Sequence, residues 1–116
     1  MDNRENIVFF FSDQQRYDTL GCNGQPLNIT PNLDQIAEEG VNFSRCYTPQ
    51  PVCGPARSVL QSGLYPTQTG CFTNRISLPL NIKTLANHMT EAGYNVAYVG
   101  KWHLASSRNK NDYRTS

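Results

Sequence analysis

Two polar clusters in this sequence combine residue types suited to chemistry on an anion. Asp13 and Gln14 offer hard oxygen ligands, which suit calcium or magnesium better than zinc. Cys53 stands at the start of a predicted helix, where first-turn N–H groups and the helix dipole favour a thiolate or a bound anion. Arg57 comes four residues later and would lie on the same helix face. These clusters indicate a metal ion and a stabilised nucleophile.

A third cluster, Lys101 and His103, adds a fixed charge and a proton-transfer group. The two residues are two positions apart in a segment predicted to be extended, so their side chains project to the same side. A lysine supplies positive charge, and a histidine transfers protons near neutral pH. Together the three clusters describe metal-assisted hydrolysis of an anionic ester.

Predicted strands explain how such distant clusters could meet. Residues 6–12 form a continuous apolar run, which is typical of a strand buried in a parallel sheet. Residues 41–47 alternate in polarity, and residues 94–99 form a third apolar segment. The first cluster directly follows the first strand, and the third follows the last. Because ligands bind beyond the carboxyl ends of parallel strands, we expect the clusters at one edge of the sheet.

Helices are predicted between these strands. Thr30 and Pro31 form a capping residue and a first helical residue, and further helices are expected over residues 54–61 and 82–92. Residues 64–80 carry turn residues without a period, so we expect a long irregular loop there. The alternation predicts an α/β fold with a mostly parallel sheet sandwiched by helices.

Composition excludes several kinds of partner. The 116 residues carry a net charge of +1, and charged residues make up 16%, so no global field recruits nucleic acid or an anionic membrane. The longest apolar run, residues 7–11, is far shorter than the roughly 20 residues of a membrane helix. No small-residue cleavage site follows it. We therefore expect a cytoplasmic chain with reduced thiols and with neither nucleic-acid nor membrane partners.

Two ordered motifs resemble the signatures of the type I, formylglycine-dependent sulfatases of the alkaline phosphatase-like superfamily. The first is Cys-x-Pro-x-Arg at residues 53–57 with its continuation to Pro66, and the second spans residues 93–104. The strand ending in Asp13 and the helix start at residues 30–34 also match in order and spacing. The resemblance therefore runs along nearly the whole chain.

The resemblance also implies how the chain divides. Members of this family are several times longer and have an α/β catalytic domain. Residues 1–104 are thus expected to form the N-terminal part of that domain, and residues 105–116 a polar tail or a truncated continuation. The buried parallel strands predicted above agree with this, because such a sheet needs further strands and helices beside it.

The resemblance implies a nucleophile made by modification of a cysteine, and a divalent metal ion beside it. Cys53 would be oxidised by a separate maturation enzyme to formylglycine, whose hydrate attacks sulfur. Arg57 would hold the hydrate. Asp13 and Gln14 would bind a divalent ion, calcium first and magnesium as the alternative, which would also contact the modified Cys53.

For the substrate, the resemblance implies a sulfate ester, either a small molecule or a sulfated glycan. Lys101 and His103 would act as catalytic residues and bind the sulfate or nucleophile oxygens. Asn74, in the predicted loop, stands where some relatives place a substrate contact.

Other functions stay open at this point. Many sulfatases have a second aspartate where this chain has Gln14, and the Asp-Gln pair also occurs in relatives that act on choline sulfate-like and phosphonate ester substrates. A phosphonate monoester or phosphodiester hydrolase is therefore the alternative enzyme. The short length favours a third possibility, a truncated and inactive fragment. Each single motif residue also has a plain structural alternative, such as a turn aspartate or a surface arginine.

Overall fold

The computed structural model describes residues 4–104, and within them the chain forms two compact units. The first unit extends to Cys46 and the second begins at Tyr47. No helix within the described range is long and apolar enough to cross a membrane.

The first unit contains two short 3-10 helices and one α-helix. These are η1 (Tyr17–Thr19), η2 (Gly21–Asn23) and α1 (Pro31–Glu39), and α1 packs against η2. Pro31 occupies the first turn of α1, and the N–H of Gly40 donates to the Ile36 carbonyl at its end, 2.9 Å away. The predicted helix after Thr30 is therefore confirmed.

The side chain of Thr30 has a different role from the expected cap. Its hydroxyl accepts a hydrogen bond from the Gly21 N–H at 2.9 Å and donates to the Asp34 carboxylate. Asp34 also accepts the N–H of Cys22 at 2.8 Å. One helical turn of α1 thus holds the backbone of η2 through two side chains.

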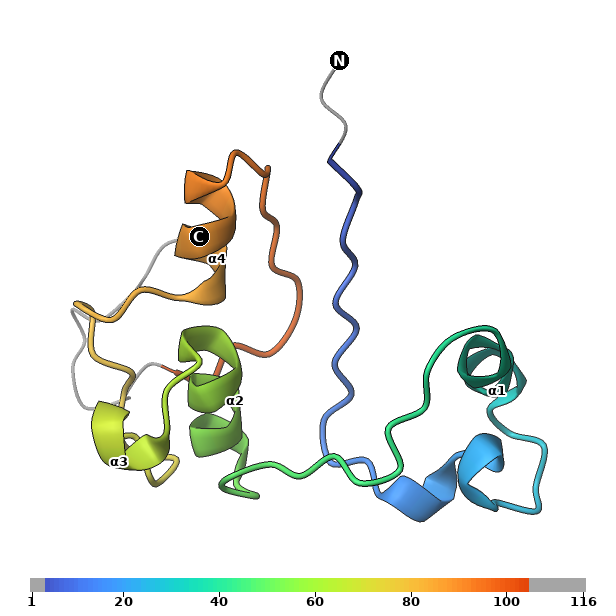
Figure 1. Ribbon diagram of the computed structural model, residues 1–116. Helices are drawn as coiled ribbons and strands as arrows, with labels where there is room; N and C mark the ends of the chain where they lie inside the picture. The colour runs from blue at the N-terminus through green and yellow to red at the C-terminus, as the bar shows by residue number, and fades with distance from the viewer. Residues whose placement is uncertain (1–3, 105–116) are drawn as a thin grey trace. The chain divides into compact units, whose positions relative to one another are not determined.

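The second unit contains three α-helices. They are α2 (Cys53–Ser62), α3 (Pro66–Thr69) and α4 (Leu85–Glu91), and α2 contacts both of the others (Figure 1). Gly63 ends α2 in the left-handed region, at φ 68°, where a glycine is favoured. The helix predicted over residues 54–61 is confirmed.

Two details of the prediction for this unit are corrected. The segment 64–80 is not wholly irregular, because α3 lies within it, with Pro66 in its first turn and Gly70 in the left-handed region after it. The last helix begins at Leu85 rather than near residue 82. Thr84 precedes it, and both the N–H and the hydroxyl of Thr84 donate to the Asn87 side chain at 2.8 Å.

The predicted parallel sheet is not confirmed. None of residues 4–104 is assigned to a β-strand, and the first of the three predicted segments runs as an extended trace (Figure 1). A strand is stabilised by a ladder of hydrogen bonds to a neighbour, and apolar content alone does not supply one. The side chains of this segment are accordingly open to solvent, with Val8 90% and Phe10 81% exposed.

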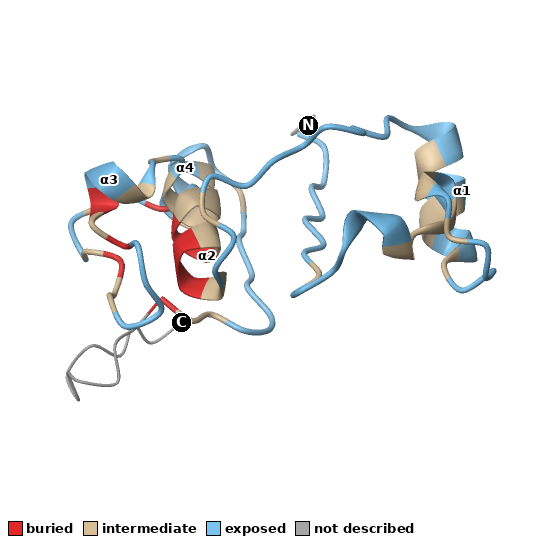
Figure 2. Cartoon of the chain, turned by 90° about the horizontal axis from the view of Figure 1, so that it is seen from below, coloured by how far each residue is buried: buried red, intermediate tan, exposed pale blue. Residues whose placement is uncertain are grey.

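Burial is confined to the second unit. In the first unit no described residue is buried, whereas in the second the buried residues gather on α2 and on the segments beside it (Figure 2). The Ser58 hydroxyl meets that of Thr69 at 3.5 Å, which joins α2 to α3. The buried residues are Gly54, Pro55, Arg57, Ser58, Thr69, Cys71, Leu78, Thr84 and Leu104.

Candidate active site

The start of α2 positions Cys53. Val52 precedes the helix in an extended conformation, and its carbonyl accepts the Ala56 N–H at 2.9 Å, which closes the first turn. Cys53 is the first helical residue and is half-buried. Its thiol therefore lies at the helix end where backbone N–H groups carry positive partial charge.

Gly54 brings two other segments close to this turn. Its N–H donates to Oδ1 of Asn74 at 2.8 Å. A Cβ placed on Gly54 would lie 3.1 Å from that oxygen and 3.4 Å from the carbonyl oxygen of His103. The residue after Cys53 is therefore in close contact with both predicted partners, Asn74 and His103.

Arg57 connects α2 to the segment that carries Lys101. The residue is only 6% exposed, and its Nη1 donates to the Lys101 carbonyl oxygen at 2.6 Å. Nη1 also donates to the Tyr98 hydroxyl at 3.3 Å, and that hydroxyl donates to the same carbonyl at 2.5 Å. The guanidinium thus holds the backbone just before His103 at the side of α2.

The segment after Tyr98 is held by further contacts. The ring of Tyr98 packs edge-on against Trp102, with 5.2 Å between ring centroids. Leu104 is buried, and its carbonyl accepts the Leu78 N–H at 3.1 Å. His103, which lies between Trp102 and Leu104 in the sequence, adopts a φ angle of 57°. This left-handed backbone conformation is uncommon for residues other than glycine. Such strain persists only where surrounding contacts enforce it, and it concentrates at functional sites.

The imidazole of His103 has one orphaned polar atom. Nδ1 is buried and has no hydrogen-bond partner among residues 4–104. Buried polar atoms are normally satisfied by protein, water or a ligand. The atom therefore needs a hydrogen-bond partner that the described residues do not supply.

The structure thus brings together five of the seven predicted site residues. They surround the N-terminal half of α2 and are Cys53, Arg57, Asn74, Lys101 and His103. Lys101 itself is exposed, and its backbone carbonyl is the group in contact with Arg57.

Asp13 and Gln14 belong to the first unit, where both are exposed. That Asp13 and Gln14 lie in the same site as Cys53 stays a prediction. Their donor set consists of carboxylate and carboxamide oxygens, which fits calcium or magnesium. No group of three His, Cys, Asp or Glu residues within the described range could hold a metal ion. Asp13 and Gln14 would supply only part of such an oxygen site.

Sequence reasoning missed Tyr98 and Gly54. The Tyr98 hydroxyl donates to the Lys101 carbonyl three residues later, and no sequence motif predicts such a contact in an extended segment. Gly54 did carry one, because a glycine within a helix costs about 1 kcal/mol relative to alanine and often marks a close approach of backbone. The three atoms that a Cβ added at Gly54 would meet identify that approach.

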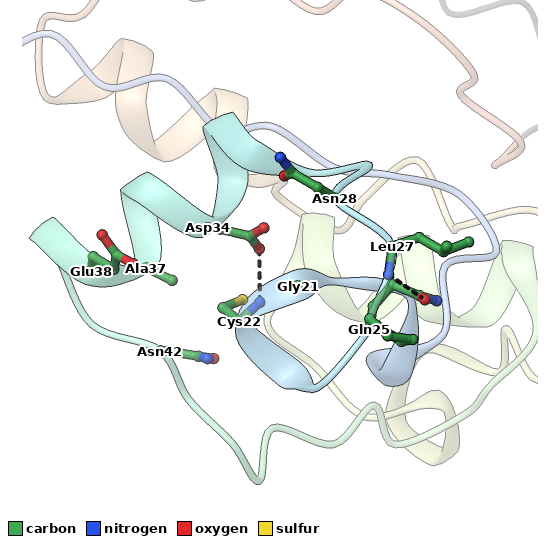
Figure 3. Close-up of a pocket in the computed structure, with 10 residues that line it drawn as sticks. Gly21, Cys22, Gln25, Leu27, Asn28, Asp34, Ala37, Glu38 and Asn42 are labelled. Atoms are coloured by element: carbon green, nitrogen blue, oxygen red, sulfur yellow. Dashed lines mark hydrogen bonds between the residues drawn. The ribbon is translucent and has the colours of Figure 1, made fainter.

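A separate pocket of about 570 Å³ lies in the first unit between η2 and α1 (Figure 3). Cys22 and Asp34 line it together with polar side chains such as Asn28 and Asn42. Partial desolvation, helped by a hydrogen bond to Asp34 and by its negative charge, raises the pKa of Cys22. None of the predicted site residues lines this pocket, so it is distinct from the site around α2.

Comparison with known proteins identifies relatives of the chain. A family model described as Sulfatase matches residues 5–116. The chain is 44% identical over 102 residues to the uncharacterized sulfatase YidJ of Escherichia coli K12, covering 87% of this chain and 20% of YidJ. It is 40% identical over 105 residues to human arylsulfatase A, covering 85% of this chain and 21% of that protein.

A solved structure agrees with these relatives. The 2-O GAG sulfatase BT1596 superposes with a TM-score of 0.74 at 34% identity, over 82% of this chain and 22% of that one. The chain spans about a fifth of the length of the curated relatives it matches. Both signature motifs lie within the matched range, and the chain belongs to the sulfatase family.

Proposed function

We propose that the protein containing this chain hydrolyses sulfate esters and that this chain supplies its nucleophile. The observation that carries the proposal is the cluster around α2. Cys53 begins the helix, Arg57 ties that helix to Lys101, and Gly54 contacts His103. A nucleophile at a helix N-terminus, with cationic residues on the same helix and on the segment bound to it, suits attack on an anionic ester. Membership of the sulfatase family supports sulfur as the reacting centre.

The proposed nucleophile is formylglycine derived from Cys53 by a maturation enzyme. As a hydrate it would attack sulfur through one hydroxyl, the ester S–O bond would break and the alcohol would leave with a proton. The second hydroxyl would then lose its proton, so that the aldehyde re-forms and the C–O bond to sulfate breaks. Lys101 would provide positive charge for the sulfate oxygens, and His103 would move a proton through its orphaned Nδ1 or its other ring nitrogen. Arg57 would keep both residues beside α2 through its bond to the Lys101 carbonyl.

A divalent ion is proposed at Asp13 and Gln14, calcium first and magnesium as the alternative. Bound there, the ion would act as a Lewis acid on the ester. The hard oxygen donors support this choice, and further ligands must come from outside the described residues.

The proposed substrate is an aryl sulfate or a sulfated glycan, in line with the names of the arylsulfatase and GAG sulfatase relatives. The alternative, a phosphonate ester, is favoured by Gln14 alone. Rates on 4-nitrophenyl sulfate and on an aryl phosphonate ester, measured with the protein as its gene encodes it, separate the two. We expect faster turnover of the sulfate, and a clear preference for the phosphonate would reject the sulfatase proposal.

Modification of Cys53 is tested by mass spectrometry of the tryptic peptide 46–57. After expression with a maturation enzyme, we expect the aldehyde or its hydrate at position 53. A peptide that retains only the thiol, while a known sulfatase in the same cells is converted, would reject formylglycine.

A further inference from the structure

The N–H of Gly54 has an acceptor that the helix itself does not provide. The first four N–H groups of an α-helix lack a partner within the helix. Gly54 is the second residue of α2 and is buried, so water is a poor substitute. The acceptor is the side chain of Asn74, 2.8 Å away and 20 residues further along the chain.

The chemistry of this contact fixes the orientation of the carboxamide. The Gly54 N–H is a donor and can form a hydrogen bond only with an acceptor. The carboxamide oxygen of Asn74 therefore faces Gly54, and the NH2 group of Asn74 points elsewhere. Asn74 is exposed, which means that this hydrogen bond, rather than close packing, orients its side chain.

The absence of a side chain at Gly54 makes the contact possible. An added Cβ would lie 3.1 Å from Oδ1 of Asn74, 3.4 Å from its Cα and 3.4 Å from the carbonyl oxygen of His103. The first distance is tighter than ordinary van der Waals contact, so an added Cβ would require the Asn74 oxygen to shift by a few tenths of an ångström.

We propose that Asn74 is a positioning residue that fixes the turn carrying Cys53 by holding the Gly54 amide with its carboxamide oxygen. The proposal rests on the proposed function, because it assigns a role in that reaction. Cys53 directly precedes the amide that is held, so release of Gly54 shifts the backbone of the nucleophile. A displacement of about 1 Å at a reacting group costs on the order of 100-fold in rate. The loss should therefore appear in kcat.

Hydrogen exchange at Gly54 measures the contact directly, without substrate. The protein as its gene encodes it is compared with Asn74→Ala, which removes the acceptor, and Asn74→Asp, which keeps it. We expect exchange at Gly54 to be about tenfold faster in Asn74→Ala and unchanged or slower in Asn74→Asp. Asn81→Ala, at another exposed asparagine of this unit, serves as the control and should leave exchange unchanged. Unchanged exchange in Asn74→Ala would overturn the proposal.

Kinetics then test the role in the reaction. We expect Asn74→Ala to lower kcat for an aryl sulfate by at least about tenfold with little change in KM. Faster exchange with unchanged kcat would overturn the positioning role, as would a change confined to KM. If the unaltered protein hydrolyses no sulfate ester, the proposed function fails instead, and the exchange result still reports the contact.

Discussion

Nη1 of Arg57 donates a hydrogen bond to the carbonyl oxygen of Lys101 at 2.6 Å, across 44 residues of sequence. This contact joins the two sulfatase signatures of the chain, because Arg57 closes the first and Lys101 lies in the second. The signature arginine therefore acts on the backbone of its neighbour segment, in addition to any contact that it makes with a modified Cys53.

Loss of this contact should destabilise the second unit. Arg57→Ala removes a charged donor from a buried position, and we expect the free energy of unfolding to fall by about 2 kcal/mol. Tyr98→Phe removes the neutral hydroxyl that donates to the same carbonyl, and we expect the free energy of unfolding to fall by about 1 kcal/mol. Urea unfolding of both variants and of the double variant measures these values. Strictly additive losses would contradict a shared contact.

Gly21 should be intolerant of a side chain. An added Cβ would lie 2.2 Å from a carboxylate oxygen of Asp34, which must then move and release the N–H of Cys22. We expect Gly21→Ala to lower the free energy of unfolding by about 1–3 kcal/mol. Asp34→Ala already removes the clash, so adding Gly21→Ala to that variant should cost much less. If Gly21→Ala lowers the free energy of unfolding equally in the unaltered protein and in Asp34→Ala, a clash with the Asp34 carboxylate is not the cause.

The thiol of Cys22 should react slowly with alkylating reagents near neutral pH. Only the thiolate reacts, and the raised pKa means that a given thiolate fraction is reached only at higher pH. Asp34→Asn removes the negative charge that contributes to this shift, so the pH profile of labelling at Cys22 should move to lower pH. Labelling by iodoacetamide, read by mass spectrometry of the Cys22 peptide, measures the profile. A profile unchanged in Asp34→Asn would exclude the carboxylate as a cause.

Metal removal should abolish most of the activity. We expect a chelator to reduce sulfate release and added calcium or magnesium to restore it, because the proposed ion activates the ester. Asp13→Asn removes a charged ligand and should raise the metal concentration needed for half-maximal activity by at least about tenfold. Asp18→Asn is the matched control, since Asp18 pairs with Arg16 on the surface of the same unit. Sulfate release that continues unchanged in the presence of the chelator would contradict the proposed metal ion.

Local signals in the sequence predicted the helices well. Pro31 and Gly63 mark where α1 begins and where α2 ends, because each acts through its own backbone geometry. The same signals flank α3, at Pro66 and Gly70, but its four residues are too short to show a hydrophobic period. The predicted strands are not confirmed within residues 4–104, because strand pairing depends on a neighbouring strand that no local pattern reveals.

The candidate site was predicted in its residues and only partly in its contacts. The two motifs identified Cys53, Arg57 and His103, which the structure places around one helix. The bond from Arg57 to the Lys101 carbonyl and the bond from Gly54 to Asn74 join residues 44 and 20 positions apart. Such contacts depend on how the chain folds back on itself, and neither spacing nor composition encodes them.

Cys53 is proposed to become the nucleophile of a sulfate ester hydrolase. The most direct test is sulfate release from 4-nitrophenyl sulfate by the protein as its gene encodes it, beside Cys53→Ala and Cys71→Ala, all expressed with a maturation enzyme. Cys71 is buried, and its Sγ contacts the Ile76 carbonyl oxygen 3.0 Å away. We predict turnover by the unaltered protein, none by Cys53→Ala, and turnover by any folded Cys71→Ala. Turnover that survives in Cys53→Ala would show that Cys53 is not the nucleophile.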